Sequence, residues 1–98
     1  MIELLKSAID SHQRVALFYQ PGERIIEPHA LGYGSSGQIL LRAYQVGGAS
    51  ASGEHEHWKL FRLDRIANAD IDPGPFSGPR HGYRRGDKHM KGGIIAEL

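Results

Sequence analysis

The chain has 98 residues, enough for one domain of ordinary size and too few for two. Twelve Lys and Arg against eleven Asp and Glu give a formal charge of +1, and 40% of the residues are hydrophobic, which excludes a wholly disordered chain and a uniformly cationic one. Cysteine is absent, so disulfides, thiolate nucleophiles and thiolate metal ligands are excluded.

Membrane and export signals are missing from the sequence. No stretch approaches the roughly 20 apolar residues of a membrane-spanning helix, and the start of the chain lacks the basic residues and long apolar run of a signal peptide. We therefore expect a cytoplasmic protein with no membrane partner. Glycine is abundant, with 13 residues, and this predicts many tight turns and short strands.

The first half of the chain predicts a helix and a hairpin. The opening ten or so residues have apolar side chains at helical spacing, among them Leu5, Ala8 and Ile9, which predicts a short amphipathic helix. Apolar residues occur in both sets of alternating positions within residues 14–20, which predicts a strand buried on both faces. A turn over residues 20–23 joins it to a second strand, which Pro28 is expected to end.

Three further strands are predicted between glycine-rich turns, over residues 38–45, 57–63 and 67–71. Residues 47–53 contain only Gly, Ala and Ser, which predicts a mobile connection. The globular body is therefore expected over residues 1–72. Residues 73–98 are rich in Pro and Gly and hold five basic against two acidic residues, net +3, which predicts a flexible basic tail.

One helix followed by five short strands has the right count for a small curled β-barrel. Two segments carry a resemblance, residues 23–33 (ERIIEPHALGY) and residues 61–66 (FRLDRI). They strongly resemble the WYL domain family, over about residues 2–72 of the chain. The resemblance implies an Sm-like or SH3-like five-stranded barrel preceded by one α-helix. It also implies a sensory module of bacterial transcription regulators or phage-defence systems that binds nucleic acid or nucleotide-like ligands.

The chain departs from that family in two respects. The segment that gives the family its name falls on Ile39, Leu40 and Leu41, so Ile and Leu stand where Trp and Tyr are expected. A leucine cannot stack a base as an aromatic ring does. Such domains usually follow a helix-turn-helix, which this sequence lacks, so we expect a stand-alone module that does not read DNA with a recognition helix.

Basic residues on the predicted strands are the candidates for a ligand site. Arg62 and Arg65 match basic positions of the family's motif, and neighbouring segments complete a predicted patch of Arg62, Arg65, Arg42, Lys59, His29 and Tyr44. Guanidinium groups present a planar fork to two phosphate oxygens, so the patch predicts a phosphate-bearing ligand, either single-stranded nucleic acid or a nucleotide. The alternative is that Arg62 and Arg65 pair with nearby carboxylates. For His29 the alternative is a histidine hydrogen-bonded to nearby backbone.

The tail mixes Arg, Gly and Tyr as an RNA-tethering arm does. Its candidate phosphate-binding residues are Arg80, Arg84, Arg85, Lys88 and Lys91. The alternative is a solvated tail without a specific partner. The other aromatic residues, Trp58 among them, are expected to lie in or beside the core.

Catalysis finds little support in the sequence. The sequence has no nucleophile elbow and no phosphate-cradling glycine loop, and it places no carboxylate pair, so we expect neither an enzyme nor a cofactor. His55 and His57 would place two imidazoles on one side of a strand, but no third metal ligand is evident. The remaining hypothesis is an interaction or oligomerisation module whose edge strand pairs with a regulator, a defence protein or a second copy.

Overall fold

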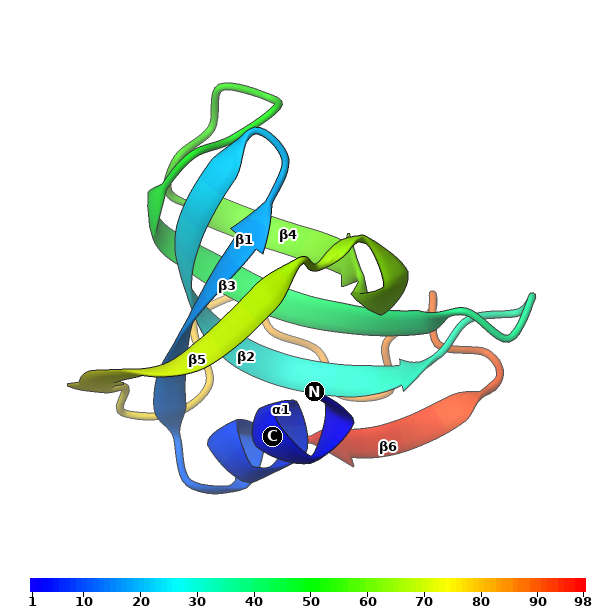
Figure 1. Cartoon of the computed structure of the whole chain (residues 1–98). Coiled ribbons are helices and arrows are strands. Elements are labelled where there is room, and N and C mark those ends of the chain that lie inside the picture. The colour runs from blue at the N-terminus through cyan, green and yellow to red at the C-terminus, as the bar shows by residue number, and fades with distance from the viewer.

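A computed structural model describes residues 1–98 as one helix and six antiparallel strands (Figure 1). The elements are α1 (Ile2–Asp10), β1 (Gln13–Tyr19), β2 (Gly22–Tyr33), β3 (Ile39–Gly48), β4 (His57–Arg62), the short 3-10 helix η1 (Leu63–Arg65), β5 (Asn68–Pro75) and β6 (Gly93–Glu97). The expected mostly-β class with one N-terminal helix is confirmed. The chain forms six strands, however, where five were predicted.

The strands make one strongly curved sheet in the order β4-β3-β2-β1-β5, with β6 added to β2 (Figure 1). β2 is long enough to serve three partners. Its first half pairs with β1, its last residues pair with β6, and β3 runs along most of its other edge. β4 and β5 are the ends of this order and do not pair with each other, so the sheet is not closed.

β2 continues past Pro28, where the sequence predicted that it would end. The register between β2 and β3 shifts between Pro28 and Ala30, which marks a β-bulge at this point. Proline has no N–H to donate to a ladder, and a bulge is one of the few places where a strand tolerates it. The strand therefore runs on to Tyr33 and offers a second half for pairing.

The core lies between α1 and the concave face of the sheet. Leu5, Ala8 and Ile9 of the helix are buried against Val15 and Leu17 of β1 and against apolar residues of β2, β3 and β4. The prediction that the first strand is buried on both faces is wrong, because only one face of β1 meets the core. Phe18, on the other face, is 40% exposed.

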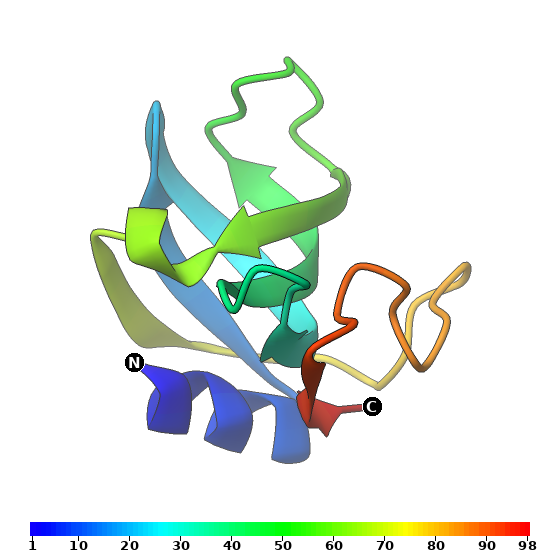
Figure 2. The same ribbon diagram turned by 90° about the vertical axis from the view of Figure 1, so that its right-hand side faces the viewer.

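The last quarter of the chain is not a flexible tail, and the body does not end at residue 72. β5 continues to Pro75, Phe76 and Met90 are buried, and β6 pairs with β2 and lies beside α1. Figure 2 shows residues 76–92 leaving β5, looping along one side of the sheet and returning to β6. The stretch is ordered because β6 satisfies the edge of β2 that β1 leaves free, and Met90 packs against Ala30 and Leu40.

No helix of the structure is both long and apolar enough to cross a lipid bilayer.

Candidate functional site

The outer face of β3 and β4 carries the candidate site. Arg42 and Tyr44 of β3 stand opposite Leu60 and Trp58 of β4, on the face turned away from the main core. Leu60 and Tyr83 pack with buried Leu40, Ala30 and Met90 in a second apolar cluster, so residues 82–90 are fixed against this face.

A hollow of about 560 Å³ remains between residues 82–88 and the strands. We call it the cationic hollow, because four basic side chains line it and only one acidic residue does. Its lining residues are Arg42, Arg84, Arg85, Lys88, Trp58, Tyr83, Asp87, Gly82 and Gly86. One basic residue comes from the sheet and three come from the stretch that was predicted to be a tail.

Two glycines shape the loop that carries three of these cations. Gly82 has φ +91° and Gly86 has φ +68°, both in the left-handed region that residues with a Cβ rarely adopt. The loop is also held by a hydrogen bond from the Tyr83 N–H to the Arg80 carbonyl, at 3.0 Å. The short segment between the glycines therefore presents Arg84 and Arg85 at the rim of the hollow.

Arg42 is the cation at the floor of the hollow, and it is paired. Its Nε lies 2.6 Å from Oδ2 of Asp87 and its Nη2 lies 3.4 Å from Oδ1. Asp87 also accepts a hydrogen bond of 2.9 Å from the His89 N–H, and its side chain is only 7% exposed. Burial alone would raise the pKa of Asp87, but the hydrogen bonds from Arg42 and His89 outweigh it and hold the pKa below its ordinary value.

The other three cations are more available. Arg84 and Lys88 are exposed and have no carboxylate within 4 Å. Arg85 lies 3.2 Å from Glu97, but its side chain is 72% exposed, so this pair is weak and screened by salt. The hollow thus keeps an excess of positive charge that faces solvent.

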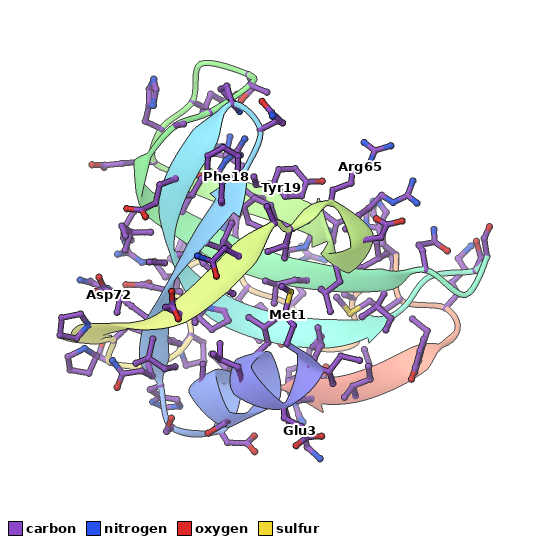
Figure 3. The ribbon with its side chains drawn as sticks, viewed as in Figure 1. Met1, Glu3, Phe18, Tyr19, Arg65 and Asp72 are labelled. Carbon is purple, nitrogen blue, oxygen red and sulfur yellow. The ribbon has the colours of Figure 1, made fainter.

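Arg62 and Arg65 do not share an anion-sized hollow, contrary to the expectation. Arg62 directs its guanidinium at Asp64, with Nη2 to Oδ2 at 2.7 Å and Nε to Oδ1 at 3.2 Å. This is the pairing with a neighbouring carboxylate that stood as the alternative. Arg65 on η1 is exposed and points outward, away from the sheet (Figure 3). Neither residue lines the cationic hollow.

Lys59 lies on the face of β4 opposite to the one that carries Leu60 and Trp58. It pairs with Ala43, whose side chain is in the main core, whereas Arg42 belongs to the outer face. The Lys59 ammonium donates to the hydroxyls of Ser50 and Ser52, at 3.1 and 3.0 Å. Alternation along a strand separates these two cations, so they cannot act on one ligand group.

His29 is a core residue and not a ligand-facing one. Its side chain is fully buried and contacts the rings of Trp58, Tyr83 and Phe76, with centroids 4.7, 5.0 and 5.5 Å away. Both ring nitrogens are within hydrogen-bond distance of backbone atoms. Burial is the main cause that lowers the pKa of His29, so the imidazole is neutral at pH 7.

Arg80 is committed to a buried carboxylate. Its Nε donates to Oε1 of Glu27 at 2.7 Å, while Arg14 donates to Oε2 of the same group at 3.0 Å. The Arg80 guanidinium also lies over the Tyr44 ring, 4.3 Å from its centroid. Arg80 and Tyr44 therefore hold the loop on the sheet, and neither lines the cationic hollow. Lys91, the last predicted tail cation, is exposed and also outside it.

Five residues that line the hollow were not predicted as site residues, the two glycines Gly82 and Gly86 and three with functional side chains. Trp58 and Tyr83 line it with their rings 6.0 Å apart and 24° from parallel, and Asp87 supplies its carboxylate. The Arg- and Tyr-containing run from residue 80 was the signal in the sequence, but nothing in it indicated the strand against which the run packs.

His55, in the loop between β3 and β4, and His57, at the start of β4, do not form a metal centre. His55 has Nδ1 2.7 Å from the Gly48 carbonyl, and His57 has Nε2 3.4 Å from Glu54. No cluster of three or more His, Asp or Glu side chains suited to a metal ion is present.

Comparisons with models of known protein families, with curated proteins and with solved structures find no match.

Proposed function

We propose that the protein is a WYL-like ligand-binding module that takes a phosphate-bearing ligand, a nucleotide or single-stranded nucleic acid, in the cationic hollow. The observation that carries this proposal is the convergence of Arg42 with Arg84, Arg85 and Lys88 around one space. The volume of about 560 Å³ lies within the range of small-molecule sites. We infer a binding role and not a catalytic one.

The chemistry of the lining supports an anion with an aromatic part. Arg84 and Lys88 have N–H donors that no carboxylate takes up, and arginine can bind two phosphate oxygens at once. Trp58 and Tyr83 supply ring surface beside these cations. A base stacked on an aromatic side chain gains about 1–3 kcal/mol, so these rings can replace the stacking that Leu40 and Leu41 cannot provide.

The fold part of the proposal is an Sm-like barrel that stays open between β4 and β5. The N-terminal helix and the order β4-β3-β2-β1-β5 support it, with β6 as an addition outside that pattern. The resemblance of residues 23–33 and 61–66 to the WYL family supports a place in transcription regulation or phage defence. Those processes use nucleic acid or nucleotide signals, which agrees with a phosphate-binding hollow.

Fluorescence of Trp58, the single tryptophan, gives a direct binding assay, because this residue lines the hollow. A single-stranded oligonucleotide and AMP are titrated at about 50 and 200 mM salt, and binding is expected to weaken with salt in proportion to the phosphates contacted. Arg84→Ala and Lys88→Ala should each weaken binding about tenfold, the loss expected for one charged hydrogen bond.

Lys91→Ala and Arg65→Ala are the matched controls, since both remove an exposed cation outside the hollow. They should change affinity only slightly. Absence of binding at low salt would remove the proposal. Equal losses for the control variants and the hollow variants would leave only unspecific attraction to a basic surface.

A second candidate function is self-association or partner binding through a sheet edge. The outer edges of β4 and β5 have no neighbouring strand, and such edges can pair with another chain. A dimer whose mass persists on dilution in analytical ultracentrifugation supports this function. A mass that stays that of a monomer at all concentrations, with or without added phosphate, leaves this second function without support.

A further inference from the structure

We infer that the cationic hollow selects a terminal phosphate monoester over an internal phosphodiester, and that Asp87 is the residue that sets this preference. The inference rests on the proposed function and names its ligand more closely. The monoester is the end group of a free nucleotide or of a phosphorylated strand.

Asp87 is bound to the Arg42 guanidinium, which is the cation of the hollow that a phosphate would most need. Arg42 is the only hollow cation that comes from the sheet, and its Nε and Nη2 lie 2.6 and 3.4 Å from the Asp87 carboxylate, with Nη2 also 3.1 Å from Nδ1 of His89. The carboxylate is nearly buried, 7% exposed, and it is the only acidic group in the lining. A ligand therefore gains the Nε–Nη2 side of the Arg42 guanidinium only by replacing Asp87 there.

Replacement of a carboxylate favours the more highly charged competitor. A phosphodiester carries one negative charge, as Asp87 does, and offers Arg42 no gain over the bond it already has. A phosphate monoester carries about −1.5 to −2 at pH 7 and has three strong acceptor oxygens. It can take the Arg42 fork and still accept from Arg84 and Lys88, which have no carboxylate partner.

The displaced carboxylate would not be left without donors. Asp87 keeps the hydrogen bond from the His89 N–H, 2.9 Å long, which comes from its own loop and moves with it. Gly86, directly before Asp87, has φ +68°, so the backbone has a glycine at the point where the loop must adjust. The exchange of ion pairs requires residues 86–89 to move while Met90 stays packed against Ala30 and Leu40.

The test compares three probes on the full chain by Trp58 fluorescence: a hexanucleotide with a 5′-phosphate, the same hexanucleotide without it, and AMP. The wild-type protein should bind the phosphorylated strand about tenfold or more tightly than the unphosphorylated one, the gain of one charged hydrogen-bonded group. AMP binding as tightly as the phosphorylated strand identifies a free nucleotide as the ligand. Markedly weaker AMP binding identifies a strand end.

Asp87→Asn and Glu97→Gln separate the role of Asp87 from a simple loss of negative charge. Glu97 also contacts the loop, through Arg85 at 3.2 Å and the Gly86 N–H at 2.9 Å, but it does not touch Arg42. Asp87→Asn frees Arg42 for a diester, so the preference for the phosphorylated strand should shrink to about threefold or less. Glu97→Gln should leave the preference unchanged.

The pH dependence of the wild-type protein is a readout that needs no variant. The second pKa of a phosphate monoester is about 6, so affinity for the phosphorylated strand should fall as pH drops through that value. Affinity for the unphosphorylated strand should not follow the same curve.

Equal wild-type affinity for both strands overturns the inference and leaves the proposed function standing. A preference that survives Asp87→Asn in a folded variant also overturns it. Failure of all three probes to bind contradicts the proposed function itself.

Discussion

The backbone N–H of Arg80 donates a hydrogen bond of 3.1 Å to Nε2 of His29. That nitrogen is therefore unprotonated, and the imidazole proton lies on Nδ1, where it is donated to the Glu27 carbonyl at 2.8 Å. One neutral ring thus joins β2 to the stretch that follows β5. Protonation of Nε2 would break the bond to Arg80 and place a charge in the core.

Stability should therefore fall as the pH drops below about 6.5, the ordinary histidine value. Burial lowers the pKa of His29 in the folded chain, so the unfolded chain binds this proton at a higher pH and is favoured in acid. One such proton gives a slope of at most about 1.4 kcal/mol per pH unit. Urea unfolding between about pH 5 and 8 measures it.

His29→Gln should flatten that pH dependence even if it lowers stability at neutral pH. His81→Gln is the control, because it removes an exposed histidine that lies outside the core. A slope that His29→Gln does not alter would show that another group titrates in this range.

Glu27 should be among the most costly polar residues to replace. Its carboxylate is 2% exposed and is held by Arg80 at 2.7 Å and by Arg14 at 2.9 Å. Glu27→Gln leaves two guanidinium groups facing each other without an anion, and breaking a buried pair costs about 3–5 kcal/mol. The loss should be near the lower end, because Arg14 and Arg80 keep some contact with water.

The control for Glu27 is an ion pair at the surface. Asp64→Asn breaks the contact with Arg62, whose side chain is 44% exposed, and exposed pairs contribute about 0–1 kcal/mol. Both variants are compared by the free energy of unfolding in urea. Similar losses for the two would contradict the structural role assigned to Glu27.

The Glu27 carboxylate should also make the stability of the protein sensitive to acid. Burial would raise the pKa of Glu27, but Arg80 and Arg14 outweigh it and lower the pKa below its ordinary value. Its contribution to stability is complete above the unfolded pKa of about 4.3 and is lost as the pH falls through the lower folded value. Glu27→Gln should remove this part of the acid unfolding, measured by circular dichroism between about pH 5 and 2.

Local patterns in the sequence were enough to predict the helix and five of the six strands of the curved sheet. Periodicity at Leu5, Ala8 and Ile9 marks the helix, and alternation at Val15 and Leu17 marks the buried side of β1. The prediction that Pro28 ends the second strand is wrong because a β-bulge lets a strand continue past a proline, and the bulge depends on the partner strand. Strand ends are thus set by pairing as well as by composition.

The ordered C-terminal stretch and the cationic hollow could not be predicted in the same way. Phe76 and Met90 anchor residues 76–92, but single apolar residues 14 positions apart show no period. The sequence did identify Arg42, Arg84, Arg85 and Lys88 as phosphate-binding candidates. The sequence could not show that these four residues line one hollow, because the distances between their side chains depend on how the loop packs against β3 and β4.

The attachment of β6 should depend on the absence of a side chain at Gly32. A Cβ there would lie 2.6 Å from the Gly93 carbonyl oxygen and 2.9 Å from Sδ of Met90, so Gly32→Ala must push β6 and the loop away from β2. Overpacking of this kind costs about 1–3 kcal/mol. Gly47→Ala is the matched control in β3, since no atom lies within 4 Å of its added Cβ, and it should change stability by less than about 0.5 kcal/mol. Amide hydrogen exchange should show faster exchange across residues 93–97 in Gly32→Ala and not in Gly47→Ala. Unchanged protection of β6 in a folded Gly32→Ala variant would contradict the close approach of these two strands.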